Sequence, residues 1–124
     1  MNSEGVIHLP SPYSVSETAD RLEALLLAKE MKIFARIDQA AEAATAGLTL
    51  RPTILLIFGN PKTGTPLMEQ FPSLAIDLPL KALIWESPET VYLSFTSPEY
   101  LQQRHHLPML PFAQLPDLFA VALK

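Results

Sequence analysis

Thr53-Ile54-Leu55-Leu56-Ile57-Phe58 is a continuous apolar run between Pro52 and Gly59, and it is the main indication of the fold. Its residues are almost all apolar and several are β-branched, which favours an extended strand. A run this apolar is typical of a strand that is covered on both faces. We therefore expect a sheet that contains residues 53–58, with other elements packed on both of its sides.

The strands around this run are predicted from shorter apolar or alternating segments. Residues 33–37 alternate and end at Asp38, and residues 6–9 form a short apolar run closed by prolines. Residues 80–86 and 90–95 flank Ser87-Pro88-Glu89, which predicts a hairpin. The expected fold class is α+β, with an antiparallel sheet of about four to five strands backed by helices.

Helices are indicated by spacing and by capping residues. Ser14 and Glu17 have the spacing of a capping box, and apolar residues follow at helical intervals to about Lys29. Gly47 closes an alanine-rich segment as a glycine C-cap. Asn60-Pro61 and Thr65-Pro66 both resemble helix starts, and the prolines after Leu107 delay regular structure until residue 118. The other expected helices span residues 39–46, 67–71, 98–104 and 118–123.

Composition limits the classes of protein to consider. The chain has 124 residues, 48% of them hydrophobic, a formal net charge of −4 and no cysteine. This predicts a single domain over 1–124. Its last part, 108–124, is a proline-rich tail ending in a short helix, which docks on the domain or on a second subunit. Without a basic cluster we expect no nucleic-acid partner, and without a long apolar run no membrane association. The lack of a secretory leader favours a cytoplasmic location.

The segment from Gly59 to Thr65 contains the densest turn signal. Two glycines five residues apart after a strand suggest a nucleotide loop, but Thr65 stands where such a loop has lysine. Pro61 also removes one backbone donor. A weaker anion site near Lys62 stays open, beside the simpler interpretation of a tight connection at the sheet edge.

The titratable residues leave several alternatives. His105 and His106 are adjacent, so on a helix they point about 100° apart and suit one metal poorly. No acid–histidine–nucleophile set stands out in the sequence, and an enzyme is not the favoured class. Asp38 and Asp77 follow apolar runs, where a carboxylate acts as a general base or, more simply, as a cap.

Several motifs together carry a family resemblance. They are Ile33-Phe34-Ala35-Arg36-Ile37-Asp38, Gly47 with Leu50-Arg51-Pro52-Thr53, Phe58-Gly59-Asn60-Pro61-Lys62 with Gly64-Thr65-Pro66-Leu67-Met68, Asp77-Leu78-Pro79-Leu80-Lys81, and Tyr100-Leu101 with Arg104. In this order, over roughly residues 5 to 107, the chain resembles the bacterial family called domain of unknown function 302. The resemblance implies a fold similar to the TATA-binding-protein-like architecture and a homodimer, and it implies no established reaction. Family members often have histidine after the aspartate, and this chain has Gln39 there.

We expect a dimeric domain that binds a small ligand or a protein partner. Its candidate ligand-binding residues are Asp38, Arg51, Phe58, Gly59, Asn60, Lys62, Gly64, Thr65 and Arg104. One alternative is a cofactor protein, with haem held by a histidine (His8, His105 or His106) or by Met109 on an apolar face. A second alternative is a small acid–base enzyme that uses Asp38 or Asp77 with Arg36 or Lys62.

Overall fold

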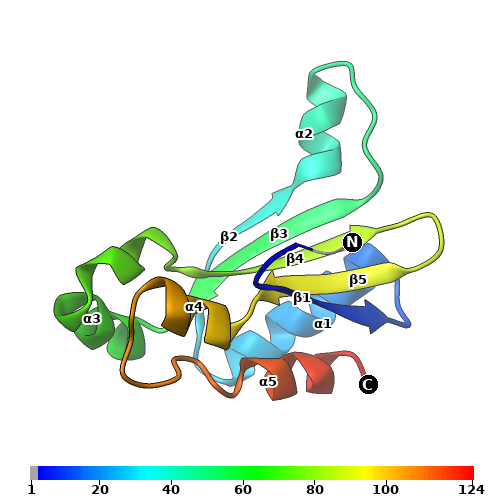
Figure 1. Cartoon of the computed structure of the whole chain (residues 1–124). Helices are drawn as coiled ribbons and strands as arrows, with labels where there is room; N and C mark the ends of the chain where they lie inside the picture. Colours follow the sequence, from blue (N-terminus) through cyan, green and yellow to red (C-terminus); the bar gives the residue numbers. More distant parts are fainter. Residues whose placement is uncertain (1–2) are drawn as a thin grey trace.

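The sheet is the main element of the computed structural model, which describes residues 3–124. Its five strands are antiparallel and lie in the order β1-β5-β4-β3-β2 (Figure 1). The strands are β1 (Val6–Ser11), β2 (Lys32–Asp38), β3 (Thr53–Gly59), β4 (Leu80–Glu86) and β5 (Val91–Thr96). The helices are α1 (Val15–Ala28), α2 (Gln39–Thr45), α3 (Pro61–Gln70), the 3-10 helix η1 (Pro72–Ile76), α4 (Pro98–Arg104) and α5 (Leu115–Ala122). The α+β class and the predicted hairpin of β4 and β5 are confirmed.

The hydrophobic core lies between one face of the sheet and helices α1 and α5. Ile54, Leu56 and Phe58 of β3 point to this face and are buried. Helix α1 packs across β2 to β5, and α5 packs beside α1 on the same side of the sheet (Figure 1). Amphipathic spacing explains the arrangement, because the apolar stripe of α1 has no other surface on which to be buried.

Within residues 3–124, no helix layer covers the opposite face of the sheet, so the expectation that β3 is covered on both faces is wrong. Burial alternates along β3, with Leu55 and Ile57 only half-buried. Side chains of directly paired residues share a face. The strand pairing therefore defines what we call the open face: His8, Ala35, Ile37, Thr53, Leu55, Ile57, Lys81, Leu83, Trp85, Tyr92 and Ser94. Both faces of β3 are apolar, which is why the sequence suggested that other elements pack on both sides of this strand.

Two helices begin earlier than expected. Of the two helix starts that the sequence indicates, Asn60-Pro61 is the actual one, and α3 runs from Pro61 to Gln70 with Pro66 inside it. Pro66 lacks the N–H of a helical hydrogen bond, but its fixed φ is compatible with helix and the chain continues. Helix α5 begins at Leu115 rather than at residue 118, because Pro116 occupies the first turn, where an N–H has no partner within the helix.

The predicted helix ends are confirmed by their caps. The Ser14 hydroxyl accepts the Glu17 N–H at 3.0 Å, and Gly47 has a φ of 76° after α2. The predicted docking of the tail on the domain is also confirmed. Arg21 of α1 donates to the Ala122 carbonyl at 2.9 Å, and Phe119 is fully buried. The C-terminal helix is therefore part of the packed core.

Candidate functional site

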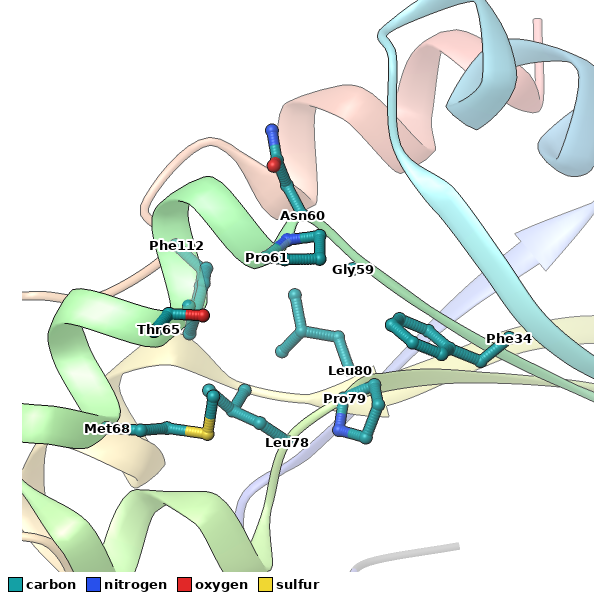
Figure 2. A pocket seen from close by; sticks show the side chains of 11 residues that line it. Phe34, Gly59, Asn60, Pro61, Thr65, Met68, Leu78, Pro79, Leu80 and Phe112 are labelled. Carbon is teal, nitrogen blue, oxygen red and sulfur yellow. The ribbon is translucent and has the colours of Figure 1, made fainter.

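A cavity of about 320 Å³ lies where β3 passes into α3. Its wall combines the ends of three strands, one face of α3 and one residue of the C-terminal segment (Figure 2). The lining residues are Phe34, Gly59, Asn60, Pro61, Gly64, Thr65, Met68, Leu78, Pro79, Leu80 and Phe112.

The turn after β3 positions most of this wall. Asn60 caps α3, since its side-chain oxygen accepts the Lys62 N–H at 3.0 Å. From this fixed start, Gly64, Thr65 and Met68 fall on one side of the helix, because positions i and i+4 lie one above the other. The helix therefore presents that side to the strand ends.

The cavity is apolar with one inward polar group. Each of the eleven lining residues is uncharged. The Thr65 hydroxyl points toward the centre, as do the Phe34 ring and the Leu80 side chain, whereas the Asn60 amide turns outward (Figure 2). This arrangement suits a neutral, mostly apolar molecule with a single hydrogen-bonding group.

Four of the predicted site residues meet at this cavity. They are Gly59, Asn60, Gly64 and Thr65. Phe58 lies one residue before them but points to the opposite side of the strand, where it is fully buried in the core. Lys62 is exposed on α3 and is not part of the lining, so the anion site considered for this loop has no support from the cavity.

Asp38 and Arg51 lie at the other end of the sheet. Lys32 pairs with Gly59 beside the cavity, whereas Asp38 pairs with Ile54 at the far end of β2. The Asp38 carboxylate accepts the Ala41 N–H at 2.9 Å and caps α2, which is the simpler of its two predicted roles. Asp38 therefore lies at the end of β2 that is far from the 58–65 segment.

A second group of polar side chains joins η1 to the end of α4. His105 Nε2 lies 2.5 Å from Asp77 Oδ2, and His105 Nδ1 lies 2.7 Å from the Ser73 hydroxyl. Arg104 approaches the same Asp77 oxygen at 3.5 Å. The sequence placed Asp77, Arg104 and His105 on its candidate list separately; the fold brings them together and adds Ser73.

Arg36, His8 and His105 have interaction partners outside the cavity. Arg36 pairs with Asp20 of α1 at 2.8 Å and not with a cavity residue. His8 Nδ1 lies 2.6 Å from the Ser94 hydroxyl on the open face. No histidine within residues 3–124 lines the cavity. Both ring nitrogens of His105 have partners, whereas the buried Nε2 of His8 has none. Among the described residues, no three acidic or histidine side chains cluster closely enough to hold a metal ion.

Sequence reasoning missed the apolar half of the cavity wall. Phe34 faces it because the β2–β3 register shifts between Ile33 and Ala35, and such a bulge turns a side chain that simple alternation places otherwise. Phe112 reaches it from a segment that is distant in sequence, with a φ of 53°. Leu78, Pro79 and Leu80 appeared in the sequence analysis as part of a family motif, and were not predicted to line a site.

The chain is similar to parts of three curated proteins. It is 43% identical over 104 residues to proteins named fluoride-specific ion channel FluC 1 of Brucella suis and of Brucella abortus, and FluC 2 of Brucella melitensis. The match covers 83% of this chain but only 41%, 38% and 38% of those proteins. The chain thus spans about two fifths of the relatives it matches. In the part of the chain that the structure describes, none of the helices has the length and apolar character needed to cross a bilayer.

A solved structure and a family model both match this chain over most of its length. A crystal structure of an uncharacterized conserved DUF302 protein from Bacillus stearothermophilus has a TM-score of 0.81 with 18% identity, covering 98% of this chain and 97% of that one. The model of the family described as domain of unknown function DUF302 matches residues 7–115, which include β2 to β5, all but the first residue of β1, and all eleven residues of the cavity wall. The chain therefore belongs to the DUF302 family.

Proposed function

We propose that this protein is a homodimeric binding module that holds a small, neutral, mainly apolar ligand in the cavity beside α3. The observation that carries the proposal is the cavity itself, of about 320 Å³ with an uncharged lining. Ligand pockets start at roughly 300 Å³ and are mostly apolar, with a few polar groups that orient the ligand. Thr65 is the inward polar group and supplies one donor and one acceptor.

The ligand test compares two leucine substitutions in the same helix. A Cβ added at Gly64 would lie 3.8 Å from Leu78 and 3.9 Å from Met68, both lining residues, so a side chain there enters the cavity. Gly64→Leu is expected to abolish binding of N-phenyl-1-naphthylamine, an apolar fluorescent dye. Thr63→Leu places the same side chain on the exposed surface next to it and leaves binding unchanged.

Native mass spectrometry of gently purified protein identifies the natural ligand class. We expect extra mass on the wild type and on Thr63→Leu that is missing from Gly64→Leu. Wild-type protein that carries no extra mass and does not bind the dye contradicts the proposed binding function.

The dimer is proposed to form through the open face, with a second copy as its occupant. This face is largely apolar and half-exposed, and Trp85 stacks at 5.3 Å on Tyr92 within it. Helix α2 stands away from the sheet at one edge, carries no buried residue and is followed by the exposed Leu48 and Leu50 (Figure 1). Apolar surfaces of this kind mark interaction sites. A second copy would cover the face and contact the projecting segment.

The dimer test uses one arginine on each side of the molecule. Leu83→Arg places a charge in the middle of the open face, and we expect a monomer by size-exclusion chromatography with light scattering. Leu27→Arg changes a residue of α1 that is 55% exposed and leaves the dimer intact. A monomeric wild type, or a dimer that survives Leu83→Arg, contradicts the proposed interface.

A role beside a channel is a second candidate, supported by the 43% identity to parts of three proteins named fluoride channels. Fluoride is a small, strongly hydrated anion, and removing it from water requires compensating hydrogen-bond donors or cations. The uncharged cavity supplies neither in sufficient number. In this candidate the domain therefore regulates such a channel through its own ligand. Titration with sodium fluoride is expected to give no heat of binding, and measurable fluoride binding contradicts this assignment.

A further inference from the structure

The polar group between η1 and α4 has the connectivity of an activated serine. Ser73 lies in η1, Asp77 follows η1 directly, and His105 is the C-cap of α4. The hydroxyl of Ser73 is 2.7 Å from Nδ1 of the imidazole, and the carboxylate of Asp77 is 2.5 Å from Nε2. A nucleophile, a base within hydrogen-bond reach of it, and a third group that orients the base are the parts that nucleophilic catalysis requires.

The proton positions follow from the donors and acceptors. A carboxylate can only accept, so Nε2 of His105 carries a proton and donates it to Asp77. Nδ1 is then the free acceptor of the neutral ring and faces the Ser73 hydroxyl. Arg104, 3.5 Å from the same Asp77 oxygen, places a positive charge beside the carboxylate. This is the tautomer in which His105 can take the serine proton.

Exposure differs sharply between the base and the nucleophile. The His105 side chain is only 4% exposed, so the ring is fixed by packing. Ser73 is exposed, so its hydroxyl is open to a substrate from solution.

We propose that Ser73 accepts acyl groups from small activated carboxylic esters, with His105 as the base and Asp77 as a positioning residue. The Ser73 oxygen attacks the ester carbonyl carbon while its proton passes to Nδ1 of His105. The bond from that carbon to the leaving-group oxygen then breaks, and the proton on Nδ1 goes to the departing alkoxide. A water molecule activated by the same nitrogen hydrolyses the acyl-serine, so water is the only co-reactant.

The substrate class follows from what these side chains supply. General-base activation contributes about 10²- to 10⁴-fold to a rate. That range suits esters with good leaving groups, such as aryl esters, better than amides. Ser73 is not part of the lining of the cavity beside α3, so this proposal stands independently of the proposed ligand.

The test is covalent labelling with a fluorophosphonate probe, which reacts with activated serines, together with turnover of p-nitrophenyl acetate. We expect one label per chain, located on Ser73 by peptide mass analysis, and none on Ser73→Ala. Ser73 is exposed, so this variant keeps the fold, and a melting curve checks it. Ser16→Ala removes another exposed serine and leaves the labelling unchanged.

The Asp77→Asn variant tests whether Asp77 orients His105 for catalysis or only stabilises the fold. An asparagine amide can donate to Nε2, which moves the ring proton to Nδ1 and removes the base from Ser73. We expect the maximal labelling rate to fall by about 10²- to 10⁴-fold, with the half-saturating probe concentration unchanged. Absence of labelling in the wild type, labelling spread over several serines, or labelling that survives in Ser73→Ala overturns the proposal. A folded Asp77→Asn variant that labels at the wild-type rate overturns the role of Asp77 and His105.

Discussion

Replacing Phe119 tests whether the C-terminal helix is an integral part of the core. Phe119 is fully buried, and its ring meets Phe95 edge-on at 4.7 Å and Phe58 at 6.0 Å between centroids. The two partners belong to β5 and β3, so this one side chain joins α5 to two central strands. Phe119→Ala removes the ring and both aromatic contacts.

The expected loss of stability follows from the burial. Deleting a fully buried phenylalanine side chain costs about 3–5 kcal/mol, through lost transfer free energy and the cavity left behind. For a small protein unfolded in urea, the dependence of unfolding free energy on urea is about 1–3 kcal/mol per molar. At about 1.5 kcal/mol per molar, a loss of about 3 kcal/mol lowers the unfolding midpoint by about 2 M.

Urea titration followed by tryptophan fluorescence measures this change. Trp85 is the single tryptophan of the chain and lies on the open face, on the other side of the sheet from Phe119. Val121→Ala, in the same helix but 49% exposed, is the matched control and should change stability by no more than about 0.5 kcal/mol. A loss below about 1 kcal/mol for Phe119→Ala would falsify the conclusion that α5 completes the core.

Four further substitutions test local features by urea or thermal unfolding followed by circular dichroism. Gly64→Ala should raise stability by about 0.5–1 kcal/mol, because alanine favours helix and the added Cβ finds ordinary contacts at 3.8 Å; a loss contradicts this. Gly47→Ala should cost about 1–2 kcal/mol from its φ of 76° alone. Gly5→Ala should cost clearly more, because its φ is similar and its Cβ would lie 2.3 Å from the Tyr100 ring; equal losses refute the predicted clash. Ser94→Ala should cost about 1–3 kcal/mol by leaving the indole N–H and His8 Nδ1 without their partner, and an unchanged midpoint contradicts that network.

Local sequence signals were sufficient to predict most helices and strands, because caps and turns depend on residues that are near one another in the chain. Ser14 marks the start of α1, Asp38 caps α2 and Gly47 ends it, as their side-chain or backbone chemistry predicts. The hairpin of β4 and β5 follows from two apolar segments and the turn between them. Two prolines led to wrong helix starts. Pro116 lies in the first turn of α5, where proline is tolerated, whereas Pro66 lies inside α3, which continues although Pro66 has no N–H to donate.

The cavity could be predicted only in part. Gly59, Asn60, Gly64 and Thr65 were identified because a dense turn signal after a strand is visible in the sequence. Phe34 and Phe112 could not be identified, because a register shift in β2 and a distant C-terminal segment bring them there. Such contacts depend on strand pairing and tertiary packing, which spacing along the chain does not encode.

The α+β class, the family and the helix caps are predictable from the sequence, because each depends on residues close together or on a linear pattern. Which face of the sheet is covered depends on tertiary packing, since both faces of β3 are apolar and the position of α1 and α5 makes the difference. Tertiary packing also decided that Asp38 and Arg104 serve different places, and that Ser73, Asp77 and His105 meet. His105 is 28 residues from Asp77 and 32 from Ser73, so their hydrogen bonds exist only once α4 has packed against η1.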